Sequence, residues 1–311
     1  MIIEEPVLKW LLDGDPAIRW QVMHDLLDTK RPDFEKERLK ISKEGWGARL
    51  IAMQEPSGLW GGGIYTPKWI STTYTLLLLR RYGLEQQYPK VQKSCKILLE
   101  KGFYKDGGIN YFGSLKNSET CVTGMVLSIL SYFQYVDNRL NSLVDYLLRE
   151  QMPDGGWNCQ RYKGARHSSF HTTISVLEGL LEFQNYSEYA HQQIWESKRK
   201  AVEFLLQHAL FKSHRTGEVV DPKMLRFSFP PRWRYDILRA LDYFQTTNIS
   251  YDSRMADALQ IVKKKRQKNG SWLLQNRHAG KTFFEMEQVS KPSRWNTLRA
   301  LRVLKWSQPN Q

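Results

Sequence analysis

Six stretches of the chain carry apolar residues three and four positions apart, and this spacing predicts helices that are apolar on most of their surface. The stretches span residues 16–27, 67–79, 119–130, 170–180, 230–241 and 292–304. One marker residue lies near the start of each stretch: Trp20, Trp69, Cys121, His171, Trp233 and Trp295. The markers are separated by 49, 52, 50, 62 and 62 residues, so the chain is predicted to repeat one helical unit about six times.

Charged, amphipathic helices are predicted between the apolar ones. They span residues 36–54, 88–101, 140–151, 192–210 and 252–267, and they alternate charged with apolar residues at helical spacing. These helices lead into glycine-rich turns, for example at residues 57–62, 106–108, 154–157 and 269–272. Glycine ends a helix and tolerates positive φ, so each unit is predicted to be a hairpin of one apolar and one amphipathic helix.

Hairpins of this kind predict an all-α fold, an α/α toroid with the apolar helices inside and the amphipathic helices outside. An open solenoid of stacked hairpins is the alternative. Closure is favoured because about six units suit a double ring, and because the loops before the inner helices are long and rich in polar and aromatic residues. The 311 residues then form a single domain, residues 1–311, and its natural ligand site is the mouth of the barrel where these loops meet.

The amino-acid composition indicates the net charge of the protein and its cellular compartment. The chain has 46 Lys and Arg against 32 Asp and Glu, a net charge of +14, which favours an anionic partner. Three cysteines form no disulfide framework and indicate a reducing compartment. The N-terminus lacks the pattern of a signal peptide, and no apolar run is long enough to span a bilayer. We therefore expect a cytoplasmic protein with no transmembrane segment.

The turn at residues 147–157, Leu-Leu-Arg-Glu-Gln-Met-Pro-Asp-Gly-Gly-Trp, resembles the Gln-Trp repeat of squalene and hopene cyclases. Shorter versions pair Gln54 with Trp60 and Gln267 with Trp272. In that motif, Gln packs on Trp and ties the outer helix to its turn. The β subunits of protein prenyltransferases use the same six-hairpin toroid. The resemblance implies the α/α toroid and an isoprenoid-like ligand, but a fold does not define the chemistry.

A second resemblance concerns a metal. Protein prenyltransferases bind zinc through Asp-x-Cys at the start of one inner helix and a His at the start of the next. Glu119-Thr120-Cys121 and Phe170-His171-Thr172 are similar to these sequences, which implies that Glu119, Cys121 and His171 are zinc ligands in a zinc-dependent transferase. Glu replaces the family's Asp. Lys116 stands where the family has a diphosphate-binding Lys, but Gly113 replaces the expected Arg.

The residue types themselves support a zinc site, because a carboxylate, a thiolate and an imidazole leave one coordination position open for water or substrate. Cys159 is a candidate fourth ligand, and its coordination would make the site structural; His167 is a weaker candidate. Each residue also has a simpler interpretation. Cys121 would line the barrel, Glu119 would be a favourable acid at a helix N-terminus and His171 would cap its helix, while Cys95 is expected to be core.

Basic residues in the mouth loops are candidate anion-binding groups. They are Lys68, Lys116, Arg161, Arg166, Arg226 and Arg294. With the expected apolar cavity, they predict a small apolar or isoprenoid-like ligand that carries an anionic group at the barrel mouth. The prenyltransferase resemblance also implies a separate helical partner subunit.

Three other functions stay open. A class II terpenoid cyclase protonates an alkene with an Asp-x-Asp-Asp cluster, and no such sequence occurs here, so this function is disfavoured. A non-catalytic module could bind a lipid, a protein or nucleic acid. No nucleic-acid motif is present, although the charge does not exclude such binding. A six-hairpin glycosidase would need paired carboxylates across a cleft. Asp106 and Asp154 are better interpreted as turn residues.

Overall fold

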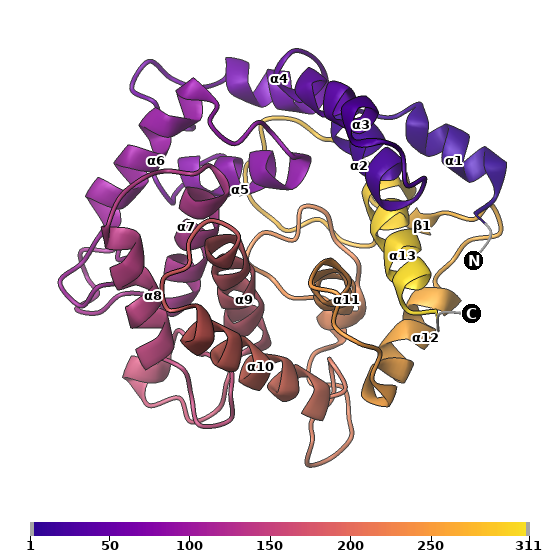
Figure 1. Ribbon diagram of the computed structural model, residues 1–311. Coiled ribbons are helices and arrows are strands. Elements are labelled where there is room, and N and C mark those ends of the chain that lie inside the picture. Colours follow the sequence, from indigo (N-terminus) through magenta and orange to yellow (C-terminus); the bar gives the residue numbers. More distant parts are fainter. Residues whose placement is uncertain (1–2, 309–311) are drawn as a thin grey trace.

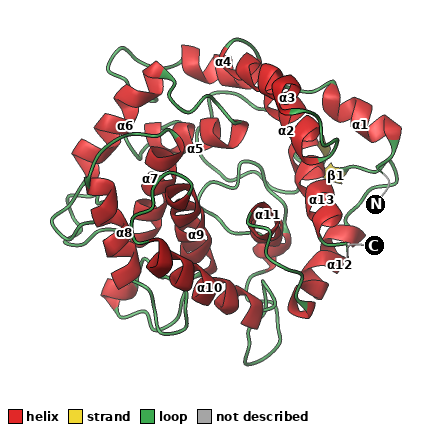
Figure 2. Ribbon diagram, viewed as in Figure 1, coloured by secondary structure: helices red, strands yellow, loops and turns green. Residues whose placement is uncertain are grey.

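The computed structural model describes residues 3–308, and its regular structure is almost entirely helical (Figure 2). Two short strands, β1 (Trp272–Leu273) and β2 (Pro292–Ser293), pair antiparallel. Short 3-10 turns lie at Leu39–Ser42, Arg161–Lys163, Pro222–Leu225 and Ser253–Met255. None of the helices in this described range is long and apolar enough to cross a membrane.

The helices form two concentric rings (Figure 1). The inner ring contains α2 (Pro16–Asp25), α5 (Thr72–Tyr82), α7 (Thr120–Tyr132), α9 (Phe170–Gln184), α11 (Ile237–Thr246) and α13 (Arg294–Trp306). The outer layer contains α1 (Glu5–Leu12), α3 (Arg31–Arg38), α4 (Gly45–Ala52), α6 (Pro89–Gly102), α8 (Arg139–Arg149), α10 (His191–Gln207) and α12 (Ala256–Lys264). This arrangement confirms the predicted α/α toroid.

Three buried tryptophans join the outer helices to the inner ones in the same way. The indole Nε1 of Trp60 donates to the Leu50 carbonyl on α4 at 2.7 Å, and its backbone N–H donates to the Thr72 hydroxyl on α5 at 3.0 Å. Trp157 repeats both bonds with Leu147 and Thr173, and Trp272 repeats them with Val262 and Thr297. Each glycine-rich turn is therefore held between its own outer helix and the next inner helix.

The glutamines next to these tryptophans hold the turns in a less uniform way. Gln54 donates to the Gly58 carbonyl in the turn and to the Lys90 carbonyl on the next outer helix. Gln151 makes the equivalent pair of bonds to Gly155 and Ser197, but the side-chain amide of Gln267 donates to Lys265 O near the end of its own helix. The first two glutamines thus connect neighbouring outer helices, which the third does not do.

The ring closes where the two ends of the described chain meet. Arg302 on α13 donates to Asp25 on α2 at 2.9 Å and to the Gln21 side chain at 3.1 Å. Lys305 adds an ion pair to Asp28 at 2.8 Å. Figure 1 shows α13 beside α2, with both ends of the chain on the same side of the molecule. These contacts exclude the open solenoid.

Two predicted helix starts were wrong. Residues 230–233 lie in an irregular loop, and α11 begins only at Ile237 because the Asp236 carboxylate accepts the Arg239 N–H and caps the helix there. Similarly, α5 begins at Thr72, so Trp69 lies in the loop before it. The predicted outer helix at 36–54 is divided into α3, a 3-10 turn and α4, with Gly45 at a φ of 71° where α4 begins.

A long loop between β1 and β2, residues 274–291, crosses the interior of the ring toward α5 (Figure 1). Its backbone pairs with the loop before α5: Trp69 N–H donates to Lys281 O at 2.7 Å, and Lys281 N–H donates to Lys68 O at 2.9 Å. Phe283, Phe284 and Met286 then pack beside Leu50 and Leu78. This crossing loop therefore fills an apolar part of the barrel with the chain's own side chains.

The closest packing in the ring is between α7 and α9. A Cβ at Gly179 would lie 2.4 Å from the Gly124 carbonyl oxygen, so the two backbones touch. We expect Gly179→Ala to lower the free energy of unfolding by about 1–3 kcal/mol, because the added methyl group meets backbone that cannot move aside easily. Urea denaturation measures the change. Gly113→Ala, which meets nothing within 4 Å, is the control, and an equal effect of both variants would contradict this explanation.

Candidate functional site

The loops before α5, α9 and α11 meet the crossing loop at one end of the ring, which we call the mouth. Trp69 Nε1 donates to the Ala279 carbonyl at 2.8 Å, and His171 Nδ1 accepts the Tyr235 N–H at 2.8 Å. A pocket of about 310 Å³, the basic pocket, lies between these loops. The residues that line it include Trp69, His171, Lys223, Arg226, Ser228, Arg234 and His278.

The basic pocket carries positive charge that the protein does not neutralise. Within the described residues, Lys223, Arg226 and Arg234 make no ion pair, whereas Arg277 at the rim is paired with Glu285. Asp221 is the acid in the lining, and its Oδ1 accepts the backbone N–H of Lys223 at 2.8 Å. The pocket therefore has a surplus of guanidinium and ammonium groups, which bind carboxylate and phosphate oxygens.

Arg232, next to this pocket, adds a further cation. Its guanidinium lies 5.4 Å from the centre of the Trp69 ring and makes no ion pair among residues 3–308. Burial lowers the pKa of Arg232 to about 10, so the side chain is still charged at neutral pH. It lines a small space with Phe283 and Phe284 of the crossing loop, beneath the mouth.

A separate aromatic cleft of about 740 Å³ shares no lining residue with the basic pocket. Tyr65, Tyr104, Tyr111 and Phe112 line it together with Ile64, Leu59 and Leu115. The Lys68 ammonium lies 5.3 Å from the centre of the Tyr65 ring in this cleft and 5.8 Å from the centre of the Trp233 ring. Trp233 in turn contacts His171 edge-on, so Lys68 lies between a ring of the cleft and a ring that contacts the lining of the basic pocket.

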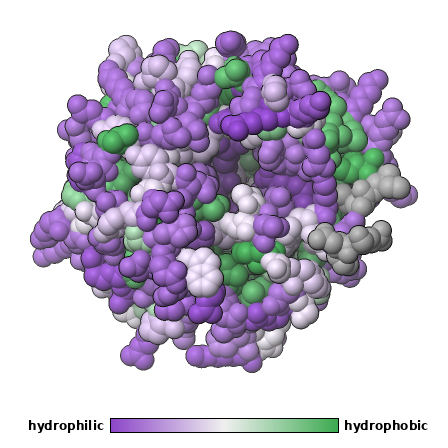
Figure 3. Space-filling view, in the orientation of Figure 1, coloured by the Kyte–Doolittle hydropathy of each residue, from purple (hydrophilic) through white to green (hydrophobic). Residues whose placement is uncertain are grey.

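The face of the molecule drawn in Figure 3 is mostly hydrophilic. Figure 3 shows a hollow near the middle of the ring, with mostly hydrophilic residues around it.

Cys121 and Cys159, the candidate fourth zinc ligand, lie together. The Cys121 thiol donates a hydrogen bond to the Cys159 sulfur, which lowers the pKa of Cys159 to about 7 and, together with burial, raises that of Cys121. Glu119 is close enough to act on both thiols electrostatically, and burial raises the pKa of its carboxyl while Lys68 opposes the shift. The structure therefore brings a pair of thiols close to one carboxyl.

His171 interacts with the backbone of the loop before α11 and not with the thiol pair. Its Nδ1 accepts the Tyr235 N–H, and burial followed by the nearby Arg234 and Arg239 lowers its pKa to about 4, so the ring is neutral at pH 7. His167 is exposed, and its carbonyl accepts a bond from Asn158. Cys95 lies in the core as expected.

The residues present do not fit the zinc site that the resemblance implied. Among residues 3–308, no three or more His, Cys, Asp or Glu side chains are grouped so that they could hold a metal ion. Glu119, Cys121, Cys159 and His171 accordingly do not form one ligand set. Zinc binding stays a prediction from the sequence, and we derive no chemical step through a metal.

The six predicted anion-binding residues are separated by the fold. Arg226 lines the basic pocket, whereas the Lys68 ammonium lies over the Tyr65, Trp69 and Trp233 rings. Lys116 and Arg166 are exposed and line none of the cavities described here, while Arg161 lies in a separate cleft near Cys159 and pairs with Glu150 at 3.5 Å. The Arg294 guanidinium lies over the Trp10 ring and donates to its carbonyl, so it fastens α1 to α13 instead.

A hydrogen-bonded chain in the basic pocket was not predicted. The Asn276 amide lies 3.2 Å from His278 Nδ1, His278 Nε2 lies 3.1 Å from Ser228 Oγ, and Ser228 Oγ donates to Asp236 at 3.3 Å. With the amide donating to Nδ1, the ring proton is on Nε2 and points at the serine. The imidazole then cannot take the serine's proton, so this chain fastens the crossing loop to α11 and is not a nucleophile–base pair.

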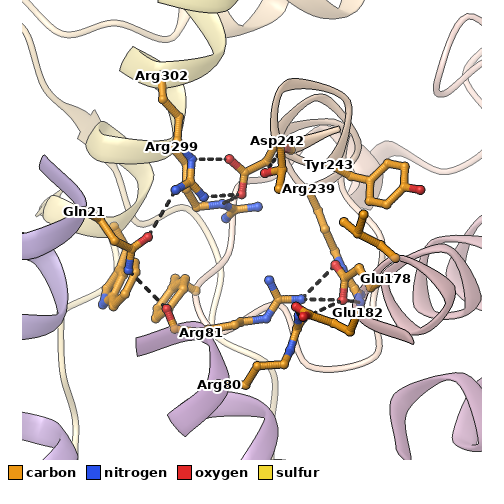
Figure 4. A pocket seen from close by; sticks show the side chains of 14 residues that line it. Gln21, Arg80, Arg81, Glu178, Glu182, Arg239, Asp242, Tyr243, Arg299 and Arg302 are labelled. Atoms are coloured by element: carbon orange, nitrogen blue, oxygen red, sulfur yellow. Dashed lines mark hydrogen bonds and ion pairs between the residues drawn. The ribbon is translucent and has the colours of Figure 1, made fainter. Parts of the chain in front are cut away.

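Beyond Phe229, the interior holds a second cavity, the arginine cavity, of about 150 Å³. Its lining includes Arg80, Arg81, Arg239, Arg299 and Arg302 with Glu178, Glu182 and Asp242 (Figure 4). The apolar spacing of the inner helices predicted an apolar barrel, and these charged residues were not predicted. A signal was present, because the pairs 178/182, 239/242 and 299/302 place charges three or four residues apart within otherwise apolar inner helices, where they share one face.

No family model matches the chain, and no curated protein matches its sequence. Solved structures similar to it include a protein from Actinoplanes, with 13% identity over 94% of this chain and 90% of that chain and a TM-score of 0.48. They also include apo type II terpene cyclase MstE from Scytonema, with 16% identity over 94% and 88% of the two chains and a TM-score of 0.47. A variant of MstE in complex with geranylgeranyl dihydroxybenzoate has 17% identity over 94% and 88%, and a TM-score of 0.49.

At these low identities and TM-scores, no ligand and no catalytic residue of the similar structures can be assigned to this chain. The α/α-toroid fold is established by its own two rings of helices, and terpene cyclases are among the structures that resemble it.

The thiol pair predicts one unusually reactive cysteine. With its pKa near 7, Cys159 is about half thiolate at neutral pH and should react with iodoacetamide well before Cys95, whose pKa is raised by burial. Cys121→Ala removes the hydrogen-bond donor and should slow the reaction of Cys159 several-fold at pH 7. Peptide mapping by mass spectrometry from pH 6 to 9 measures both rates. Cys95→Ala is the control, and a half-maximal rate near pH 8.5 in the unmodified chain would contradict the prediction.

Proposed function

We propose that this toroid binds an amphipathic small molecule at its mouth. The anionic group of the ligand, a phosphate, diphosphate or carboxylate, lies in the basic pocket, and its apolar chain lies along the aromatic cleft. An isoprenoid chain is the apolar part that the sequence resemblance suggests.

The observation that carries the proposal is the set of unpaired cations in the basic pocket. Lys223, Arg226 and Arg234 line one concave site and make no ion pair among the described residues, although Asp221 is also in the lining. Lys223 and Arg226 are exposed, and Arg234 is half-buried. Arg232 lies next to them in a more buried position. Guanidinium groups in a partly dehydrated pocket favour a phosphate or carboxylate ligand over water.

The shape of the site favours a small molecule over nucleic acid. The unpaired cations line a pocket of about 310 Å³, which is within the range of small-ligand sites. The aromatic cleft is lined by Tyr65, Tyr111 and Phe112, and such rings suit an apolar chain. The helical partner subunit expected from the prenyltransferase resemblance is not required for this binding and stays a prediction.

The proposal is tested by comparing an amphipathic ligand with its anionic part and its apolar part. We expect farnesyl diphosphate to bind more tightly than either inorganic diphosphate or farnesol in isothermal titration calorimetry. Arg234→Ala should weaken farnesyl diphosphate about tenfold, the loss of one charge-assisted contact, and should leave farnesol unchanged. Phe112→Ala should weaken farnesyl diphosphate and farnesol but not inorganic diphosphate.

Arg199→Ala is the matched control, because Arg199 is an exposed residue of α10 that makes no ion pair among the described residues. An equal loss in Arg199→Ala and Arg234→Ala would show a general charge effect and would overturn the proposal. Tight binding of single-stranded DNA or RNA, steeply dependent on salt and insensitive to Phe112→Ala, would support the nucleic-acid alternative instead.

One observation favours cyclisation of an isoprenoid chain as a second candidate function. Burial raises the pKa of Glu119, and Tyr65 and Tyr74 lie near enough to interact with this carboxyl. Aromatic rings can stabilise a cation. The absence of an Asp-x-Asp-Asp sequence still counts against it.

Glu119→Gln separates the two functions. If the chain cyclises, this variant should lose product formation from geranylgeranyl diphosphate while its affinity for that substrate changes less than twofold. Gas chromatography with mass spectrometry detects the product. If no cyclic product forms with the unmodified chain, the second candidate function is excluded and the binding proposal is unaffected.

A further inference from the structure

A pair of thiols lies where α7 meets the loop before α9. Cys121 is in the first turn of α7, and Cys159 lies two residues after Trp157 in that loop. The Cys121 thiol donates a hydrogen bond to the Cys159 sulfur, so the two sulfur atoms already face each other. Both side chains are half-buried, whereas Cys95 is buried in the core. Reagents in solution therefore reach this pair more readily than Cys95.

The packing of α7 against α9 fixes the position of the pair (Figure 1). Gly124 follows Cys121 by three residues on α7, and a Cβ there would lie 2.8 Å from Val176 Cα on α9. One turn earlier on α9, the Thr172 hydroxyl accepts the Cys159 N–H at 3.3 Å. Residues three and four apart share a helix face, so both cysteines lie about one turn from this backbone contact. A disulfide requires cysteines that are held close together in this way.

Cys159 also lines a polar cleft of about 390 Å³, which is within the range of small-molecule sites. The lining contains charges of both signs, Arg149 and Arg161 with Asp106 and Glu150. The two arginines are exposed, and both approach Glu150, at 3.9 and 3.5 Å. A cleft with both signs of charge suits a zwitterion, such as a thiol derived from amino acids, because each charge of the zwitterion finds an opposite one.

We propose that Cys121 and Cys159 form a thiol–disulfide exchange site that takes a small disulfide of the glutathione class from this cleft. The Cys159 thiolate attacks one sulfur of that disulfide, and one glutathione thiolate leaves. The Cys121 thiol loses its proton, its sulfur attacks the Cys159 sulfur, and the second glutathione thiolate leaves. One disulfide is reduced and one Cys121–Cys159 disulfide forms, while the two glutathione thiolates take up the two protons that the cysteines release.

This exchange is independent of the amphiphile binding proposed at the mouth. The cleft beside Cys159 shares no lining residue with the basic pocket or the aromatic cleft. In a reducing compartment the pair stays a dithiol, and it closes when the small disulfide accumulates. The exchange then fastens the loop before α9 to α7 in response to the redox state.

Peptide mapping without a reducing agent tests the proposal. Protein treated with a chelator is incubated with glutathione disulfide at about pH 8.5, where ordinary cysteine thiols are half ionised. We expect the unmodified chain to give linked Cys121 and Cys159 peptides, and Cys121→Ala to stop with one glutathionyl group on Cys159. Cys159→Ala should slow the modification of Cys121 several-fold, because Cys121 does not line the cleft. Oxidation should also raise the melting temperature, because the bond restricts the unfolded chain.

A second variant tests the cleft. Arg161→Ala should slow the reaction with glutathione disulfide several-fold and leave the reaction with uncharged hydroxyethyl disulfide unchanged. Equal slowing with both reagents would overturn the role of the cleft.

Cys95→Ala is the matched control, and it should leave the linked peptides and their rate of formation unchanged because Cys95 is buried. A lasting adduct on Cys159 of the unmodified chain without linked peptides would overturn the proposal. Linkage through Cys95 would also overturn it, because it indicates unfolding before oxidation. A lower melting temperature after oxidation would show that the bond strains the fold, with the same consequence.

Discussion

The buried ion pairs inside the ring are the interaction on which the rest of the structure depends. Arg302 on α13 binds Asp242 on α11 and Asp25 on α2, so one side chain joins three inner helices at the place where the ring closes. Burial alone would raise the pKa of Glu178, but Arg239 and Arg81 hold it below its usual value. Removing one partner of a buried pair typically costs about 3–5 kcal/mol, so these charges constrain the inner helices strongly.

The same interior is divided into two cavities of different character. The segment around Ser228 and Phe229, fastened by His278 of the crossing loop, separates the basic pocket from the arginine cavity. The crossing loop also fills the apolar space near Leu78 with Phe283 and Phe284. A long apolar ligand therefore has no open path along the barrel axis, which is why we place its chain in the cleft at the mouth.

The sequence predicted that basic residues gather at the candidate site, but not which individual residues form it. Lys68 and Arg226 were predicted as anion-binding residues because basic residues in loops before inner helices are expected at the mouth, and Arg226 lines the basic pocket. Arg294 was assigned to the same role, yet it contacts Trp10 of α1, because only the docking of the N-terminal helix decides where that side chain lies. The resemblance implied that Cys121 and His171 bind one metal ion. In the structure, Nδ1 of the His171 imidazole accepts the Tyr235 backbone N–H, so this nitrogen is not available to a metal ion.

The sequence by itself determined the toroid, because helix spacing, glycine-rich turns and a repeat near 50 residues are local signals that each unit carries independently. It also indicated a surplus of positive charge without locating it. Only the tertiary structure decided that the barrel centre is charged instead of apolar, since Arg239, Arg299 and Arg302 meet acids from helices distant in the chain. Whether a buried charge is paired depends on contacts between repeats, and these are set by ring closure, which no single repeat encodes.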